Sequence, residues 1–396
     1  MSALPRTPSP ASLWSRQFVL ALTMSSVFAV GFNASVPLLP LYLASFQASD
    51  SDIGLVVGAF GLGALVFRPL SGQLVDRFGA RRVSMAGALL FVATTPLMAF
   101  TTLVPALLVL RLVQAAGLVS FWTASTALGM STAQASRMGV AMGFVGMTGP
   151  FGGLVASPLA VPVAEAAGWQ GAFVGMGLVG VVAMALCLLV RVPARVARTP
   201  MKRSLVNRAA LTPALFFWSW ALTQGPILGF VPLLALDRNL GNPGLFFAVF
   251  SLSNTVFRPA IGIAVDRWGS PAVALPSLLV SAVSIAMIGI ADTQGWFLAW
   301  AFIYGLANGG IYTSLMTLAI DRSPVNERGS AIATFQWGWD MGMSISSMVV
   351  GTLTGLLGYG GIFVFSALGP IAGSALFAWS WRTRRLHVPV RAAAIE

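Results

Sequence analysis

Cysteine and histidine are almost absent from this chain. Cys187 is the only cysteine, and His387, the only histidine, lies close to the C-terminus. One cysteine excludes an internal disulfide. Catalysis would need a nucleophile with its base, or a cluster of metal ligands, and these two isolated side chains supply neither. No phosphate-binding Walker loop is present either. We therefore expect no enzymatic activity, no metal site, no cofactor and no ATP-driven pumping.

Charge is also scarce. The chain has 396 residues, of which 57% are hydrophobic and 9% charged, whereas soluble domains carry about 25% charged residues. Charge-free apolar runs such as 17–49, 83–110 and 341–381 exceed the roughly 20 residues that a helix needs to cross a bilayer. Most of the surface must therefore face lipid.

Spans of this length nearly exhaust the chain. We predict an all-α membrane protein with twelve transmembrane helices, and no room for a soluble domain. The expected spans are residues 17–45, 52–75, 83–102, 105–128, 138–163, 170–190, 209–234, 244–265, 271–291, 295–319, 329–356 and 361–381.

The net charge of +12 has a topological explanation. Basic residues fall in alternate loops, and the segment 191–208 contains six of them and no acid. Because cytoplasmic loops retain Lys and Arg, both termini and this central loop are predicted to be cytoplasmic. A lipid-headgroup patch is the other interpretation of the basic loop. We expect the bilayer, and not nucleic acid, as the partner of these charges.

A segment of the first half recurs in the second. FRPLSGQLVDRFG, numbered 67–79, returns at 257–269 as FRPAIGIAVDRWG, and eight of the 13 positions agree. We call the constant difference in numbering between these two copies the repeat offset. Duplicated six-helix halves are a common plan of secondary transporters. We predict an N-terminal six-helix bundle over 1–190, a cytoplasmic basic linker over 191–208, and a C-terminal six-helix bundle with a short tail over 209–396. We expect a monomer.

The loop after the second span carries a dense motif, Gly72-x3-Asp76-Arg77-x-Gly79-x-Arg81-Arg82, with a degenerate copy at Gly262, Asp266, Arg267 and Gly269. The chain here resembles the major facilitator superfamily, and specifically its drug and metabolite efflux branch. The resemblance implies that family's fold and a gate, in which Asp76 faces the positive start of the eleventh span near Gly329. By symmetry Asp266 would face Gly139. The arginines are also explained by topology alone.

Two arginines precede these aspartates by about two turns. Arg68 and Arg258 occupy equivalent positions in the two copies. Long basic side chains near a span end can extend to the membrane surface. That interpretation and a gating role both stay open.

Arg111 lies within the fourth span, and an intramembrane charge is a functional candidate by default. Arg111 and Gln114 share one helix face. The pair resembles the Arg-x-x-Gln-Gly motif of the superfamily, with Ala115 in place of the glycine. That resemblance implies a role in proton coupling or in binding an anionic substrate. A structural hydrogen bond to a helix carbonyl is the alternative.

Asp340 is the acidic residue deepest inside a predicted span. Burial favours the protonated form of such a carboxyl, and a nearby arginine favours the ionised form. We predict that Asp340 is the proton-coupling acid, paired with Arg111. A purely structural ion pair is the alternative.

The fifth span carries Gly149, Pro150, Gly152 and Gly153. They resemble the fifth-span motif of the family's antiporters, although one residue instead of two separates the proline from the paired glycines. Glycines also allow close helix packing. Both interpretations stay open.

Polar and aromatic side chains on the spans expected to line a central cavity suit an amphipathic or ring-bearing molecule. The candidates are Asn33, Trp122, Thr123, Gln224, Asn254, Tyr304, Asn308, Tyr312, Gln336, Trp337 and Trp339.

These features favour a secondary active transporter of a small organic molecule in the cytoplasmic membrane, working by alternating access as a proton-coupled exporter. Uptake or facilitated diffusion of an organic anion, with Arg111 as its clamp, is the alternative. A transporter-like protein that acts as a sensor or chaperone is a more remote one.

Overall fold

The computed structural model describes residues 15–132, 138–190, 206–324 and 327–383, and in these ranges all regular structure is helical. The helices are α1 (Arg16–Ser45), α2 (Asp50–Phe78), α3 (Ala80–Met98), α4 (Val104–Thr132), α5 (Met138–Leu189), the 3₁₀ turn η2 (Arg208–Ala210), α6 (Leu211–Ala221), α7 (Gln224–Asp237), α8 (Pro243–Trp268), α9 (Ser270–Gly289), α10 (Gln294–Asp321), α11 (Arg328–Ser366) and α12 (Leu368–Arg382).

These helices make the twelve predicted spans. In the described part of the chain, eight helical stretches are long and apolar enough to cross a membrane. Two of them contain two spans each, because α5 bends at Gly168 (φ 70°) and α11 bends at Gly358 (φ 68°). A positive φ is readily available only to glycine. Together with α3 and α10 the count is twelve, as the sequence predicts.

The seventh span differs from the prediction, because it is broken. The unbroken helix expected over 209–234 ends at Ala221 and resumes at Gln224. Pro226 has no N–H to donate to the carbonyl one turn earlier. The N–H of Gly225 leaves the helical pattern too, since it donates to Ser346 Oγ at 3.0 Å. The break therefore follows from the Gly-Pro pair.

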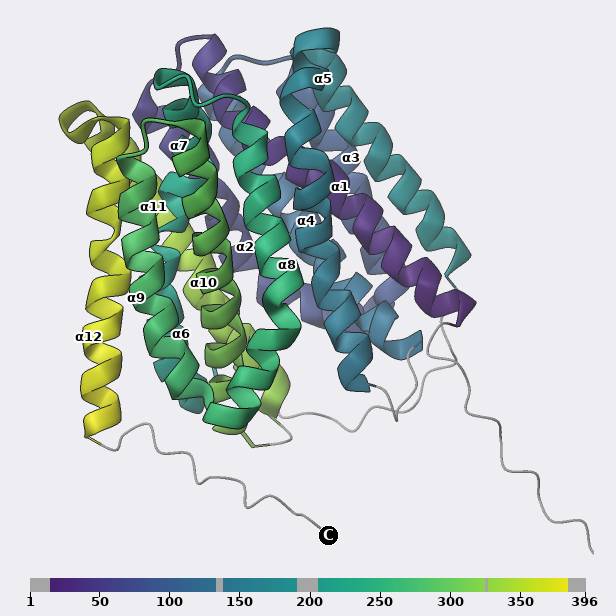
Figure 1. Ribbon diagram of the computed structural model, residues 1–396. Helices are drawn as coiled ribbons and strands as arrows, with labels where there is room; N and C mark the ends of the chain where they lie inside the picture. The colour runs from purple at the N-terminus through teal and green to yellow at the C-terminus, as the bar shows by residue number, and fades with distance from the viewer. Residues whose placement is uncertain (1–14, 133–137, 191–205, 325–326, 384–396) are drawn as a thin grey trace, which may run out of the picture.

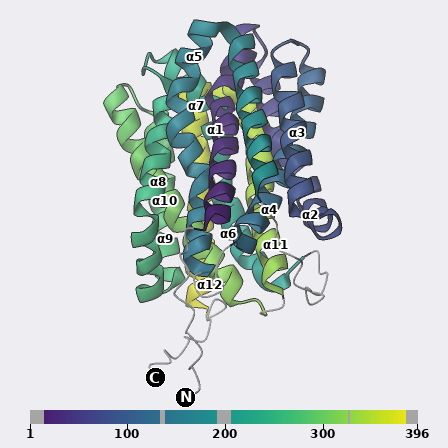
Figure 2. The same ribbon diagram turned by 90° about the vertical axis from the view of Figure 1, so that its right-hand side faces the viewer.

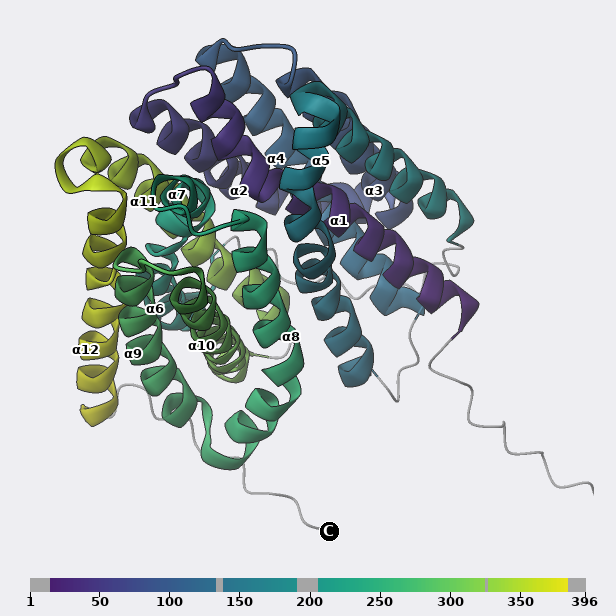
Figure 3. The same cartoon turned by 45° about the horizontal axis from the view of Figure 1, so that its top comes forward.

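The helices form two groups. Figure 3 shows α1–α5 toward the upper right and α6–α12 toward the lower left. In Figure 1 α1, α3, α4 and α5 lie on the right, α6, α7, α9, α11 and α12 lie on the left, and α2 lies behind α8 in the middle. Seen from the right-hand side, α1 lies in front, with α5 on one side and α2 and α3 on the other (Figure 2). We call the end where α1 begins and α12 finishes the terminal end, and the opposite end the far end.

Each group has its own aromatic core. In the first, Phe28 stacks on Phe121 with ring centroids 3.7 Å apart. In the second, Phe217 stacks on Phe335 at 4.2 Å. Large apolar side chains such as Leu356 are exposed on the outside, as a surface in contact with lipid requires.

The backbone repeats what the sequence repeats. Gly79 (φ 86°) and Gly269 (φ 83°) make the same turn after α2 and after α8. Gly168 and Gly358 make the two bends described above. Both pairs keep the repeat offset, so the conformation confirms the duplication.

The two groups touch at the far end and separate toward the terminal end. A Cβ added to Gly54 or Gly58 of α2 would collide with the backbone of α11, and one added to Gly244 of α8 would collide with α5. A Cβ at Gly72 or Gly262, nearer the terminal end, would meet no atom within 4 Å. The groups are therefore in close contact at the far-end glycines, and the glycines nearer the terminal end make no such contact in the described part of the chain.

Candidate functional site

The strongest polar contact between the groups joins α2 to α11. Arg68 Nε donates to Asp340 Oδ2 at 2.7 Å, and Arg68 Nη2 donates to Oδ1 at 2.8 Å. Asp340 is 0% exposed and the Arg68 side chain 21% exposed. A two-pronged arginine–carboxylate pair combines charge with fixed geometry. Each partner therefore neutralises the other away from water.

This pair corrects the predicted partner of Asp340. The predicted pairing of Asp340 with Arg111 is wrong, because Arg111 lies on α4, which packs behind α2. Gly63 of α2 lies against Ala115 of α4, while Gly61 of α2 lies against the Asp340 carbonyl of α11. The helix between them therefore supplies the arginine.

Arg111 is enclosed within the first group. Its Nη1 donates to Gln114 Oε1 at 2.5 Å, and Gln114 Nε2 donates to Thr95 Oγ1 at 2.7 Å. The guanidinium lies over the Phe60 ring, 5.0 Å from its centroid, and the residue is 6% exposed. The shared helix face of Arg111 and Gln114 is confirmed. Among the described residues no carboxylate pairs with Arg111, and its Nε has no acceptor.

Arg258, the repeat mate of Arg68, crosses between the groups in the opposite direction. Its Nη1 donates to the Gly146 carbonyl of α5 at 3.1 Å, and its Nη2 donates to Asn254 Oδ1 at 3.2 Å. Its guanidinium lies 5.6 Å from the centroid of the Tyr312 ring. Both arginines thus reach across to the opposite half, and the two interpretations, extension to the membrane surface and a gating role, stay predictions.

Pro150 explains why Gly146 can accept. In an α-helix the N–H of residue 150 would bond to the carbonyl of residue 146, and proline has no N–H. Arg258 therefore satisfies a carbonyl that the proline leaves free. Adding the repeat offset to Pro150 gives Asp340, so the acceptor of Arg258, the Gly146 carbonyl, lies one helical turn before the residue that corresponds to the acceptor of Arg68.

The loop motif lies at the terminal end, where α2 ends and α3 begins. Gly79 makes the turn into α3, and Arg81 Nη2 donates to the Leu188 carbonyl at 2.8 Å. The remaining charged members, Asp76, Arg77, Arg82, Asp266 and Arg267, are exposed. At Gly72 and Gly262 an added Cβ would meet no atom within 4 Å. The predicted contact of Asp266 with the start of α5 cannot be followed, because the side-chain surroundings at residue 139 lie outside the described part of the chain. The gate at the terminal end stays a prediction for the closed state.

The predicted cavity residues divide into two sets. Tyr304 of α10 and Gln224 of α7 are buried and lie at the break between α6 and α7. Gln224 Nε2 donates to Tyr304 Oη at 2.7 Å, and Thr223 Oγ1 lies 2.5 Å from the same oxygen. Asn254, Tyr312 and Gln336 gather at Arg258, where Gln336 Nε2 donates to Tyr312 Oη at 3.3 Å.

The other candidates are dispersed. Asn33 Nδ2 donates to the carbonyls of Ala29 at 2.8 Å and Gly149 at 3.3 Å, which ties α1 to the fifth-span motif. A Cβ on Gly152 or Gly153 would collide with neighbouring helices, whereas Gly149 has open space. Half-buried positions hold the remaining members, Trp122, Thr123, Asn308, Trp337 and Trp339.

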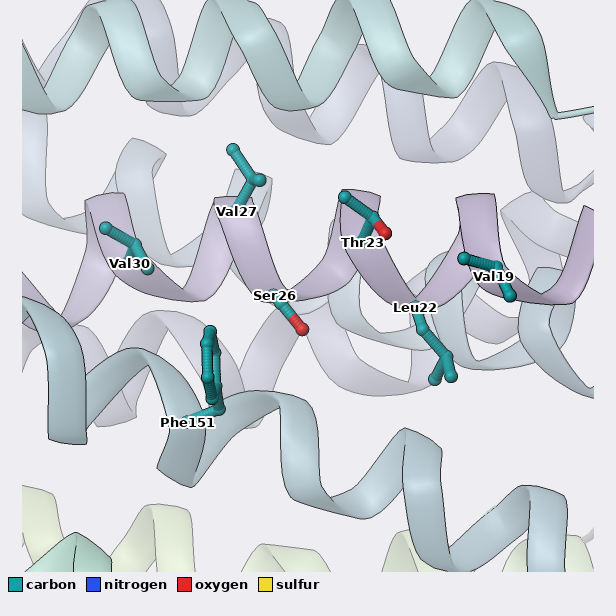
Figure 4. Close-up of a pocket in the computed structure, with 7 residues that line it drawn as sticks. All are labelled: Val19, Leu22, Thr23, Ser26, Val27, Val30 and Phe151. Atoms are coloured by element: carbon teal, nitrogen blue, oxygen red, sulfur yellow. The ribbon is translucent and has the colours of Figure 1, made fainter. Parts of the chain in front are cut away.

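A separate hollow lies against α1 and is lined by Val19, Leu22, Thr23, Ser26, Val27, Val30 and Phe151. Figure 4 shows Leu22 and Ser26 pointing toward the α5 segment that bears Phe151. No predicted site residue lines this hollow, and its lining carries no charge. The charged site at Arg68, Asp340 and Arg258 is distinct from it.

Sequence reasoning missed the acceptors and not the charges. Thr95 and Phe60 around Arg111 are ordinary core residues in the sequence, and no pattern marks them. The repeat offset equates Arg68 with Arg258 and Asp340 with Pro150, but the acceptor of Arg258 is the carbonyl of Gly146, one turn earlier. The signal for that carbonyl is the proline four residues after it, which removes its helical donor.

Twelve helices in two repeated groups, with buried charges where the groups meet, define a membrane transporter of the secondary type. The model of the Major Facilitator Superfamily matches residues 21–246 and 221–395. The chain belongs to that superfamily.

Curated relatives include transporters of known and unknown cargo. An uncharacterized MFS-type transporter of Salmonella typhimurium is 25% identical over 366 residues, covering 89% of this chain and 94% of its own. The tetracenomycin C resistance and export protein of Streptomyces glaucescens is 23% identical over 391 residues, covering 79% and 71%. The quinolone resistance protein NorA of Staphylococcus aureus is 35% identical over 74 residues, 19% of each chain.

Solved structures share the fold. The nucleoside transporter NupG aligns with a TM-score of 0.78 at 14% identity, over 92% of this chain and 99% of its own. A bacterial homolog of the human lysosomal transporter Spinster, in an inward-facing and unoccupied conformation, aligns with a TM-score of 0.79 at 12% identity, over 94% and 98%.

Proposed function

We propose that the protein exports a small organic molecule across the cytoplasmic membrane in exchange for protons, by alternating access. The observation that carries this proposal is the Arg68–Asp340 pair. It joins the two groups, and Asp340 is fully buried. An intramembrane carboxyl with a partner on the opposite half is where a proton can act on the contact between the halves.

The coupling step is electrostatic. A proton on Asp340 removes the charge that holds the Arg68 guanidinium and turns one carboxylate oxygen from acceptor into donor. Arg68 then lacks its counter-ion, so the joint between α2 and α11 weakens. The other charged or titratable groups at this place are Arg258 and Tyr312, the latter within electrostatic range of both arginines. Proton binding at Asp340 therefore favours a different arrangement of the halves.

Efflux is the direction that the relatives support, since export or resistance is in the printed names of two of them. The distribution of basic loops supports a cytoplasmic terminal end. With that orientation the present structure faces the cytoplasm, ready to receive a molecule for export. Asp76 and Asp266 would close this end by facing the starts of α11 and α5.

The test begins with the substrate. Metabolites inside and outside cells that contain or lack the protein are compared, and the compound that moves is then followed in proteoliposomes. In the wild type we expect a proton gradient to drive its accumulation. The Asp340→Asn variant should lose at least tenfold of the gradient-driven flux and keep downhill exchange, because its side chain cannot release a proton.

An Asp292→Asn variant is the matched control, because Asp292 is exposed at the far end. It should transport as the wild type does. Full gradient-driven accumulation by Asp340→Asn would overturn the coupling role.

The second candidate is uptake or facilitated diffusion of an organic anion with Arg111 as the clamp. It is favoured by the lack of a carboxylate partner for Arg111 among the described residues. Flux directed inward, and lost in Arg111→Gln but not in Asp340→Asn, would select it. A sensor or chaperone role would follow if no compound moves.

A further inference from the structure

We infer that Arg258 is the docking point for the anionic group of the transported molecule, and that this group is a carboxylate carried by an aromatic compound. The inference rests on the proposed transport function and specifies its substrate class. It assigns the anion to Arg258 and not to Arg111.

The first observation is that two equivalent arginines use their hydrogen-bond donors unequally. The Nε and Nη2 groups of Arg68 form the fork that holds both oxygens of Asp340. In Arg258 the same fork is only half used. Its Nη2 donates to the neutral amide oxygen of Asn254, and its Nε has no acceptor among the described residues. The geometry that binds a carboxylate in one repeat is therefore available in the other.

The second observation is the charge. Arg68 and Arg258 bring two positive charges to the contact between the halves, and Asp340 brings one negative charge. In the described part of the chain, the acceptors of Arg258 are all neutral. A cation without a counter-ion is costly inside a membrane. An anion that arrives with the substrate removes that cost.

The third observation is access. Gly262 lies one turn beyond Arg258 on α8, and Gly143 lies one turn before Gly146 on α5. A Cβ at either glycine would meet no atom within 4 Å. On both helices, therefore, the position one turn from the Arg258–Gly146 contact toward the terminal end has free space beside it. Arg111, in contrast, is 6% exposed and covered by Phe60.

The ring preference follows from Tyr312. Its ring lies under the guanidinium, at 5.6 Å from centroid to Cζ. An aromatic body attached to the carboxylate can therefore pack against the tyrosine, while the carboxylate takes the Nε–Nη2 fork. Asn254 gives up one hydrogen bond, and Gly146 keeps its own.

Three pairs of matched probes test the inference on the purified protein. They are benzoate with benzamide, 1-naphthoate with 1-naphthamide, and indole-3-acetate with indole-3-acetamide, titrated in nanodiscs without any gradient. At least one acid should bind about tenfold more tightly than its amide, because hydrogen bonds to a charged group are the stronger ones. Arg258→Gln should abolish the preference, and Arg258→Lys should retain a part of it.

Arg238→Gln is the matched control, since Arg238 also donates to a backbone carbonyl, that of Ala291 at 2.8 Å, but at the far end. It should keep the preference. The inference is overturned if no acid binds more tightly than its amide, if the preference survives in Arg258→Gln, or if Arg111→Gln removes it instead. Should Arg258→Gln fail to fold, undiminished preference in Arg258→Lys overturns it, because an ammonium cannot replace the fork.

The two proposals fail separately. Acid-selective binding without any flux would refute the exporter and leave the Arg258 site intact. Proton-driven export with equal binding of acids and amides would refute the site and leave the exporter intact.

Discussion

Gly146 and Pro150 form an acceptor that neither residue could provide alone. The proline removes the N–H that would occupy the Gly146 carbonyl, and the glycine leaves room for the guanidinium, because a Cβ there would stand 3.2 Å from Arg258 Nη1. In the other half, Asp340, which corresponds to Pro150 under the repeat offset, provides a carboxylate to Arg68. A proton can therefore neutralise the Asp340 carboxylate of the second half, but it does not change the Gly146 carbonyl of the first half.

This origin of the acceptor predicts energetic coupling between Pro150 and Arg258. Pro150→Ala restores the helical N–H, which then competes with Arg258 for one carbonyl. The cost of Arg258→Gln should therefore shrink in the Pro150→Ala background, with an interaction energy of about 0.5–1.5 kcal/mol. Thermal unfolding of the wild type, both single variants and the double variant measures it.

Pro276→Ala serves as the control partner in the same cycle, since Pro276 lies on α9 and not on the helix that Arg258 contacts. Strict additivity of Pro150→Ala and Arg258→Gln would show that the proline does not create the acceptor.

The charges at this site were predictable from the sequence, and their partners were not. Asp340 and Arg111 stand out because charges are rare in apolar runs, so scarcity alone identifies them. Their pairing depends on which helix lies between α4 and α11, and periodicity within one helix carries no such information. Arg68 reaches Asp340 because α2 is the helix in contact with α11.

At the scale of helices, α5 uses prolines to bind its neighbours. Pro162 leaves the Pro158 carbonyl free, and Asn242 Nδ2 of α8 donates to it at 2.8 Å. Pro150 does the same for Gly146 and Arg258. Neighbouring side chains commonly satisfy such carbonyls in membrane helices. The carbonyls of Pro158 and Gly146 thus connect α5 to residues of the α8 segment at two positions along the helix.

The break between α6 and α7 is held by a hydroxyl. Tyr304 Oη of α10 binds both Thr223 and Gln224, the residues that join the two helices. Tyr304→Phe would leave the buried amide of Gln224 without this partner, so we expect a loss of about 1–3 kcal/mol. A lower melting temperature of the purified protein would show it.

Tyr42→Phe is the comparison, because Tyr42 makes a single bond, to the Thr101 carbonyl at 3.1 Å. An equal or larger loss in Tyr42→Phe would contradict the role given to Tyr304. Hydropathy alone does not predict this break, because the apolar run continues through it, but the Gly225-Pro226 pair in the sequence marks its position.

At the scale of the whole molecule, the repeat places corresponding glycines at the two contact surfaces between the halves, which we call seams. Gly54 of α2 and Gly244 of α8 are related by the repeat offset, and each lies against the backbone of a helix from the opposite half at the far end. Gly72 and Gly262 also correspond, and both face open space. Repeat-related surfaces that are in contact at one end and apart at the other suit two halves that rock between closing one end and closing the other.

Opposite effects of two glycine substitutions on one helix test this motion. Gly54→Val overpacks the far-end seam by about 1–3 kcal/mol, enough to shift a two-state population roughly 5- to 150-fold, so the terminal end should close. Gly72→Val clashes with nothing in the present conformation but should obstruct the closed terminal end, so that end should stay open. Spin labels at Gln73 and Ser330 in a Cys187→Ala background report the α2–α11 distance there. The short-distance population should rise in Gly54→Val and vanish in Gly72→Val, and transport should fall in both. A shift in the same direction would mean that the seams are packing defects of one fixed state and not the contacts of alternating access.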